Sequence, residues 1–289
     1  MEHSSLIALK TQQIKTLFQD AKLIAEEKAD LAEVLNYLSG LDKEFSSVAY
    51  EAAAMVFALK DLKENNALDR WKLFLRTVED HHSLSIHIGL GWAFAQHNSS
   101  PLAYFNLLDS IQRYRVMDGM GYYDGMLRHR QRVKKPYTPE NISGAALQSY
   151  DQGIGRSLWY NYLEEPAKIR EAIAKFAAER HAGLWRGVGI AVAYVGGFDK
   201  KILDAVYTEA KPFCAQLSAG AALAARTRMQ THTHTADLEL VCNTWCNASA
   251  EEAAMITERA FASAATEENA YETWMTAIEK QVISSEMMN

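Results

Sequence analysis

The chain contains very few residues that would interrupt a helix. Only 5 of its 289 residues are proline, the residue that most strongly breaks an α-helix. Apolar residues recur at helical spacing along nearly the whole sequence, whereas the alternating β-branched runs of strands are scarce. Helices are expected, for example, at residues 46–62 and 70–82. The sequence therefore predicts an all-α fold with helices of about 12 to 20 residues.

Pairs of glycines separated by one residue lie inside these helical stretches. The pair in Tyr150–Trp159 first suggests a phosphate-binding loop. A dinucleotide loop, however, follows a buried strand and has a third glycine, and this segment has neither. Glycine inside a helix costs about 1 kcal/mol relative to alanine. Two explanations stay open: the helices approach too closely for a side chain, or a ligand lies against the bare backbone.

The glycine blocks also recur at a nearly constant spacing. Three pairs of similar blocks lie 98 to 100 residues apart: Ala49–Met55 with Ser149–Gly155, His87–Ala95 with Trp185–Ala193, and, more weakly, Met117–Gly121 with Ala215–Gly220. This spacing predicts an internal duplication of about 98–100 residues that forms stacked helical hairpins with a continuous core. The expected parts are an N-terminal helical extension at 1–44, a duplicated core at 45–245 with halves at about 45–144 and 145–245, and C-terminal helices at 246–289.

Composition argues against several classes of protein. Hydrophobic residues make up 48% and charged residues 23%, as in globular proteins. The net charge of -6 gives no overall attraction for nucleic acid or anionic membranes. The basic run at 128–135 precedes Pro136 and is read as a helix end and a solvated loop, because no nucleic-acid-binding motif accompanies it. We expect no binding to nucleic acid.

Targeting and redox features predict a cytoplasmic protein. The N-terminus lacks the basic and apolar regions of a signal peptide, and no run of 18 apolar residues could span a membrane. The 3 cysteines show no disulfide-framework spacing, which suits a reducing compartment. We therefore expect no association with a membrane.

Acidic and aromatic residues beside the glycine blocks are the best candidates for chemistry. A buried acid near an aromatic ring can act as a general acid, because desolvation raises a carboxyl pKa. The alternative is an internal ion pair, for example between Asp151 and an arginine elsewhere. Tryptophans near these blocks could line a tunnel for a long flat ligand, or could simply fill the core. The candidate catalytic residues are Glu51, Asp118, Asp151 and Arg156, and the candidate substrate-binding residues are Tyr50, His87, Trp92, Tyr122, Gln152, Trp159 and Trp185.

Histidines and cysteines form no standard metal motif. His82 and His87 are five residues apart and so do not share a helix face, and the two Glu-x-x-His motifs that a di-iron bundle needs from separate helices do not both occur. Walker, Gly-x-Ser-x-Gly and Cys-x-x-Cys motifs are also missing from the sequence. A second cluster contains His232, His234, Cys242 and Cys246, whose spacing is not a standard zinc pattern. We predict no cofactor and no metal, and binding of a metal by this second cluster stays an open question.

Five blocks in order carry a resemblance to a known family. They are Ala49–Met55, His87–Ala93, Met117–Gly125, Tyr150–Trp159 and Leu184–Gly197. Over residues 45 to 230 they resemble a bacterial family of unknown function whose genes often lie in enediyne polyketide clusters. The resemblance implies a role in making or handling a polyene-derived natural product, and it supplies no established catalytic residues. Unlike the family pattern, this chain has Ala52 in place of a glycine, and Tyr122-Tyr123 in place of phenylalanine and histidine.

Two functional hypotheses follow. The first is an accessory protein or enzyme in the biosynthesis of an enediyne-like or polyene-derived polyketide, which binds a long apolar ligand. The second is a non-catalytic helical scaffold or carrier that docks on a polyketide synthase or another protein. The expected partner is an apolar small molecule or polyketide intermediate, and association with a synthase or into a homo-oligomer is left open. Whether the protein is an enzyme is also left open.

Overall fold

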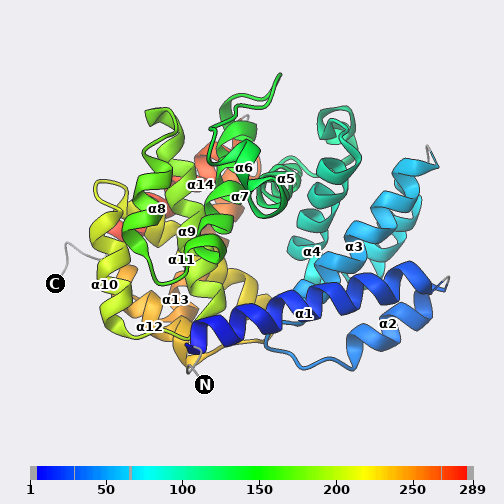
Figure 1. Ribbon diagram of the computed structural model, residues 1–289, viewed down its shortest axis with the longest axis horizontal. Coiled ribbons are helices and arrows are strands. Elements are labelled where there is room, and N and C mark those ends of the chain that lie inside the picture. Colours follow the sequence, from blue (N-terminus) through cyan, green and yellow to red (C-terminus); the bar gives the residue numbers. More distant parts are fainter. Residues whose placement is uncertain (1–4, 29, 65–66, 268, 285–289) are drawn as a thin grey trace.

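The computed structural model describes residues 5–28, 30–64, 67–267 and 269–284 (Figure 1). These residues form helices and no strand, so the predicted all-α fold is confirmed. The α-helices are α1 (Leu6–Glu27), α2 (Leu31–Ser39), α3 (Ser46–Lys63), α4 (Asp69–His97), α5 (Arg113–Leu127), α6 (His129–Arg132), α7 (Gly144–Tyr162), α8 (Pro166–Ile173), α9 (His181–Val195), α10 (Lys200–Glu209), α11 (Cys214–Gln230), α12 (Ala236–Trp245), α13 (Ala250–Ala264) and α14 (Ala270–Ser284), and the 3-10 helices are η1 (Pro101–Leu107) and η2 (Ala178–Arg180). None of the helices in this part of the chain is long and apolar enough to cross a membrane.

Helix α4 extends well beyond its expected end. The sequence pattern predicted a helix at 70–82, whereas α4 continues to His97. It passes through Gly89 and Gly91, which weaken an isolated helix. Both lie against neighbouring helices, and this packing stabilises α4 more than the glycines weaken it. Helix α3 agrees with its prediction to within one residue.

The glycine-bearing helices α4, α5, α7, α9 and α11 follow one another in the same direction. The start of α7 meets the start of α5, because the Ser149 hydroxyl donates to the Tyr114 carbonyl at 2.5 Å. The ends of these two helices also meet, because the Asn161 amide donates to the Gly125 carbonyl at 3.2 Å. Because successive helices are parallel, each pair needs a return segment, and these segments contain η1, α6, α8 with η2, and α10.

The two glycines of each pair contact two different helices, which lie on opposite sides of the helix that carries the pair. A Cβ built on Gly119 would lie 2.1 Å from the Ile88 carbonyl oxygen of α4, and one on Gly121 would lie 1.9 Å from the Tyr150 oxygen of α7. In α7, Gly153 likewise touches α5 and Gly155 touches α9. The first glycine of a pair thus meets the preceding helix and the second meets the following one. Close approach of the helices therefore accounts for these glycines, and the short distances suit Cα–H···O contacts.

The structural step is shorter than the spacing of the sequence blocks. The first glycines of successive helices are Gly89, Gly119, Gly153, Gly187 and Gly220, which are 30 to 34 residues apart. The offset of 98 residues between Gly89 and Gly187 spans three of these steps. One step is a single helix with its return segment. The duplication of about 98–100 residues itself stays a prediction.

Helix α3 runs opposite to the glycine-bearing helices. Its end lies at the start of α4, where Asp61 accepts hydrogen bonds from Arg70 and from the Trp71 backbone at 3.0 Å. Its first half lies deeper along α4, where Glu51 contacts Gly89. The sequence block in α3 therefore does not correspond in direction to its proposed counterpart in α7.

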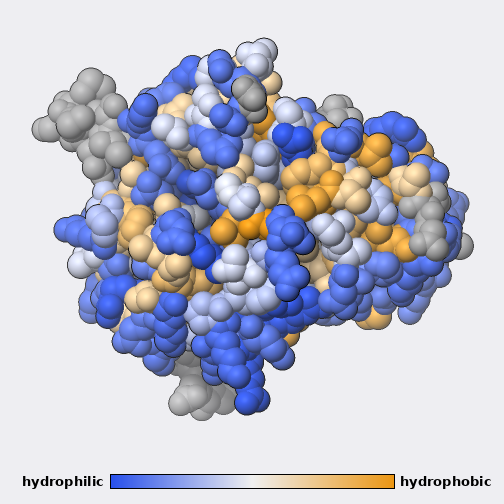
Figure 2. All heavy atoms as spheres, turned by 90° about the horizontal axis from the view of Figure 1, so that it is seen from above, coloured by the Kyte–Doolittle hydropathy of each residue, from blue (hydrophilic) through white to orange (hydrophobic). Residues whose placement is uncertain are grey.

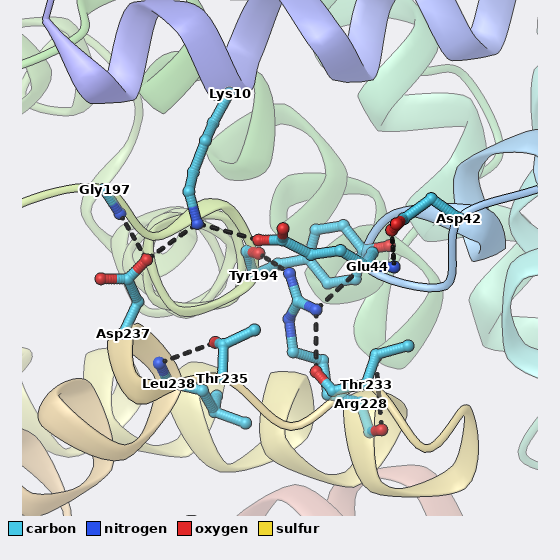
Figure 3. A network of polar contacts seen from close by, with 10 residues as sticks. All are labelled: Lys10, Asp42, Glu44, Tyr194, Gly197, Arg228, Thr233, Thr235, Asp237 and Leu238. Carbon is cyan, nitrogen blue, oxygen red and sulfur yellow. Dashed lines mark hydrogen bonds and ion pairs between the residues drawn. The ribbon is translucent and has the colours of Figure 1, made fainter.

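A polar network brings the two ends of the helix row together (Figure 3). Lys10 of α1 forms ion pairs with Glu44 at 2.8 Å and Asp237 at 2.9 Å. The buried Arg228 of α11 donates to the carbonyl oxygens of Glu44 at 2.9 Å and Tyr194 at 2.5 Å. These contacts join α1, the segment before α3, the end of α9, α11 and the start of α12. The row of helices is therefore curved into a ring, and α1 lies across it.

A ring of parallel helices has two openings. Helix α14 covers the opening at which α5, α9 and α11 begin. The Tyr271 ring lies 4.6 Å from the Tyr114 ring, measured between centroids. Glu279 pairs with Arg186 of α9 at 2.6 Å and accepts a hydrogen bond from Gln216 of α11 at 2.8 Å. This end of the ring is thereby closed.

Candidate functional site

The ring encloses a cavity of about 410 Å³. This volume lies within the range of roughly 300–1,000 Å³ that is usual for small-molecule sites. Its walls come from α1, α3, α4, α5, α7, α9 and α11. Figure 2 shows hydrophobic residues gathered near the middle of one face of the molecule, bordered by hydrophilic ones.

Helix α5 shows that the cavity is elongated. Arg115, Asp118, Tyr122 and Met126 line it at intervals of three or four residues, so they share one helix face. From Arg115 to Leu127 the helix rises about 18 Å at 1.5 Å per residue. Arg115 is 6% exposed and Leu127 is 63% exposed. The cavity is thus closed near Arg115 and opens near Leu127, where it is also lined by the exposed residues Lys15, Gln19 and Gln96.

Asp118 lies in the cavity wall with its carboxylate satisfied by neighbours. It is fully buried and accepts hydrogen bonds from the Gln152 amide at 2.7 Å and the Arg156 guanidinium at 3.2 Å. Burial lowers the pKa of Arg156, but Asp118 and Glu51 outweigh that effect, so its pKa is raised. The Arg156 guanidinium also lies 4.5 Å from the centre of the Tyr122 ring. Asp118 and Arg156 therefore form an ion pair in the cavity wall.

Glu51 is the second carboxyl group of the cavity and lacks such support. It is 5% exposed and forms no ion pair shorter than 4.0 Å with any residue that the structure describes. Burial raises its pKa to about 8; Arg156 opposes that rise and Asp118 adds to it. The Trp92 indole lowers this pKa slightly, although its N–H makes no hydrogen bond of regular geometry. Glu51 is therefore protonated at neutral pH and can donate a proton or a hydrogen bond.

Aromatic rings surround these polar groups. Trp92 meets the edges or faces of Tyr122 and Tyr123 at centroid distances of 5.2 and 5.5 Å, nearly perpendicular to both. Phe18 of α1 lies 4.8 Å from Trp92 on the mouth side. Tyr160 lies 5.9 Å from Tyr122, and burial raises its pKa to about 12, so its hydroxyl stays protonated. Such rings favour flat unsaturated ligands and attract positive charge to their faces.

The structure brings together part of the set of residues proposed from the sequence. The residues that line the cavity are Glu51, Asp118, Arg156, Trp92 and Tyr122. Gln152 does not line it but orients Asp118 by its hydrogen bond. The residues that lie outside are Asp151, Tyr50, His87, Trp159 and Trp185.

The residues outside the cavity have partners of their own. Asp151 forms a buried ion pair with Arg180, which donates to both carboxylate oxygens at 3.0 Å, as the alternative of an internal pair anticipated. Tyr50 stacks on His82 at 3.6 Å between ring centroids. The His87 ring contacts the Ser83 carbonyl at 2.7 Å, and burial lowers its pKa to about 4. The remaining two, Trp159 and Trp185, pack in the hydrophobic core.

Sequence reasoning missed several residues of the cavity. Arg115 could have been found, because it shares a helix face with Asp118 and Tyr122 at spacings of three and seven residues. Tyr160 could have been found in the same way, because it lies four residues after Arg156, and Tyr123 directly follows Tyr122. Phe18 and Tyr194 come from α1 and α9 and carry no such signal.

Within the described part of the chain, no group of three or more histidine, cysteine, aspartate or glutamate side chains could hold a metal ion. His234 instead pairs with Glu239 at 3.1 Å. Cys242 and Cys246 are buried in the hydrophobic core.

The fold and the cavity together define an all-α protein with an elongated, aromatic-walled cavity. Residues 5–282 match the family described as "Protein of unknown function (DUF1702)", and the chain belongs to that family. The match covers nearly the whole chain, including the N- and C-terminal helices on either side of the blocks at 45–230. No curated protein and no solved structure shows significant similarity to the chain.

Proposed function

We propose that this protein binds an elongated, mostly unsaturated small molecule in the cavity and transfers a proton to it from Glu51. The observation that carries this proposal is a buried carboxyl group without an ion pair in the wall of an aromatic-walled cavity. The cavity length suits a chain-like ligand, and the rings of Trp92, Tyr122 and Tyr123 suit a conjugated one. The family resemblance points to a polyene-derived polyketide intermediate of an enediyne-like pathway as the ligand.

The proposed reaction is a shift of double bonds without oxidation. Glu51 donates its proton to one carbon of the conjugated chain, where the π electron pair forms the new C–H bond. The resulting cation is stabilised by the surrounding ring faces. The Glu51 carboxylate then removes a proton from another carbon, and that C–H electron pair forms the new double bond. Protons and electrons balance, so the step requires no cofactor.

A carrier function is the second candidate, and the state of Asp118 favours it. Asp118 is held by Gln152 and Arg156 and offers no second free base, so in the enzyme Glu51 alone would have to give and take the proton. A carrier would need only to enclose a reactive polyene and to deliver it to a protein such as a polyketide synthase. Self-association into a homo-oligomer is compatible with either function.

Deuterium incorporation distinguishes the two functions. The protein is incubated in D₂O with the polyene released by an enediyne-type polyketide synthase, and the recovered polyene is analysed by mass spectrometry. An enzyme incorporates deuterium, the E51Q variant binds but does not incorporate it, and E33Q, which alters an exposed carboxyl, behaves as wild type. Binding without any incorporation by the wild type would leave only the carrier function. Absence of binding would refute both.

A further inference from the structure

Arg115 is a buried cation without a counter-ion. Its side chain lines the closed end of the cavity and is 6% exposed. Among the described residues it makes no hydrogen bond and no ion pair within 4.0 Å, and its Nη2 atom is buried without a partner. The guanidinium carbon of Arg115 lies 5.3 Å from the centre of the Trp274 ring, which is a cation–π contact. Arginine is rarely buried unless it is paired.

The charged groups around Arg115 do not neutralise it. Asp118 is the nearest acid on its own helix, but Gln152 and Arg156 already occupy that carboxylate. From α11, Arg226 adds a second positive charge and is itself held by Glu258 at 2.8 and 3.2 Å. Burial and Arg226 lower the pKa of Arg115 to about 10, so it stays protonated at neutral pH. The closed end of the cavity therefore carries an excess of positive charge.

Other buried arginines of the protein show what Arg115 lacks. Arg180 has both oxygens of Asp151 as partners, and Arg228 has three backbone carbonyl oxygens. Burying a guanidinium without such partners is strongly unfavourable. A site that tolerates this cost is typically one where a ligand supplies the missing anion.

We propose that Arg115 binds an anionic head group, a carboxylate or a phosphate, of the ligand, whose unsaturated tail extends toward the opening at Leu127. The planar guanidinium can form two parallel hydrogen bonds with either anion. This inference rests on the proposed function, because it places the head group in the same cavity. The Glu51 carboxyl lies near Asp118, Arg156 and Trp92, and Asp118 is three residues from Arg115, about 4.5 Å along the axis of α5. The double bond that receives the proton is therefore close to the head group.

Binding of cis-parinaric acid, a fluorescent conjugated long-chain acid, tests the proposal against its uncharged methyl ester. We expect the wild type to bind the acid about 10- to 100-fold more tightly than the ester, as charge-assisted hydrogen bonds imply. R115Q should lose this preference and keep its affinity for the ester. R130Q, which removes an exposed arginine, should retain the preference of the wild type. Competition by dodecanoate and by dodecyl phosphate then shows which anion the site prefers.

The outcomes separate this inference from the proposed function. Equal binding of acid and ester by the wild type would overturn the head-group site and leave the apolar cavity in place. If neither probe binds, the proposed function falls as well. A folding readout guards against a merely structural role: R115M should raise the melting temperature of the ligand-free protein, because it removes an unpaired buried charge. A marked fall in melting temperature would show that Arg115 supports the fold instead.

Discussion

The glycine-bearing helices have one face toward the cavity and one face away from it, and α7 carries charged residues on both. Its outward face holds Asp151, whose charge is fully matched by Arg180. Its inward face holds Arg156 beside the cavity, near the unpaired Glu51 and Arg115. Between neighbouring helices the backbones touch at glycines and leave no space. The cavity between the same helices stays open and contains polar groups without partners.

The difference separates stability from function. Tight backbone contacts stabilise the folded state, and a buried charge that keeps its partner costs far less than one that has lost it. The loss of either should therefore be felt in any solvent or ligand condition. Unmatched buried groups raise that free energy, and only binding or catalysis gives a reason to retain them. Substitutions of the matched residues should therefore lower the stability of the protein. Substitutions of the unmatched cavity residues should instead impair binding or catalysis.

The largest effect is expected on the outward face, for R180M. This change leaves the Asp151 carboxylate buried without its partner, which typically costs about 3–5 kcal/mol. It also releases the segment that Arg180 holds through the Tyr137 carbonyl at 2.8 Å. Urea denaturation measures the loss as a lower midpoint.

A double variant checks the reason for that loss. Adding Asp151→Asn to R180M removes the stranded charge and should restore part of the stability. If the double variant were no more stable than R180M, the loss would come from packing and not from the charge.

Glycine contacts between helices come next in size. Gly121→Ala places a methyl carbon 1.9 Å from the Tyr150 carbonyl oxygen, a backbone atom that cannot move alone. Overpacking of this kind costs about 1–3 kcal/mol. Gly40→Ala is the matched control, because its methyl group would lie 3.6 Å from the nearest atom. Similar unfolding free energies for both variants would mean that the helices can separate without cost.

The fold was largely predictable because its signals are local. Scarce prolines and helical spacing are read directly from neighbouring residues, and they gave α3 nearly to its ends. The length of α4 was wrong because tertiary contacts at Gly89 and Gly91 decide whether that helix continues. Block similarity indicated a spacing but not a direction, so it could not show that α3 runs opposite to α7.

The site was predictable in part, because several of its residues lie beside the glycine blocks. These are Glu51, Trp92, Asp118, Tyr122 and Arg156, and Arg115 would have followed from its spacing on α5. Asp151 and Arg156 stand on one helix, yet the sequence does not say which of them faces inward. That depends on the outer segment bearing Arg180, which lies 29 residues away. The Phe18 wall depends on where α1 crosses the ring, and no local pattern encodes that.

On the inward face, E51Q should change how stability depends on pH. The folded state keeps the Glu51 proton up to about pH 8, whereas the unfolded chain loses it near 4.5. Folding therefore takes up a proton between these values, and the Glu51 contribution to stability falls as pH rises through this window. E51Q removes that contribution. The difference in unfolding free energy between E51Q and wild type should shift by about 1.4 kcal/mol from pH 6 to pH 7.

Comparing the two proteins at each pH cancels the other titrating groups. His82 and His87 have lowered pKa values and make stability rise with pH below about 6.5, but they do so in both proteins. Parallel stability profiles would show that Glu51 is ionised in the folded protein. That result would also remove the proton donor from the proposed reaction.

The smallest effect is expected where the ring is closed by partly exposed charges. K10M removes the ion pairs to Glu44 and Asp237, whose side chains are 32% and 27% exposed. Water screens pairs of this kind, so the expected loss is about 0.2–1 kcal/mol, and it should shrink in high salt. K200M, which removes a fully surface pair with Asp204, should change the unfolding free energy still less. Closure then depends chiefly on the buried Arg228 and not on Lys10. If K10M lowered the unfolding free energy as much as R180M does, the Lys10 ion pairs would be as important for stability as the buried pair of Asp151 and Arg180.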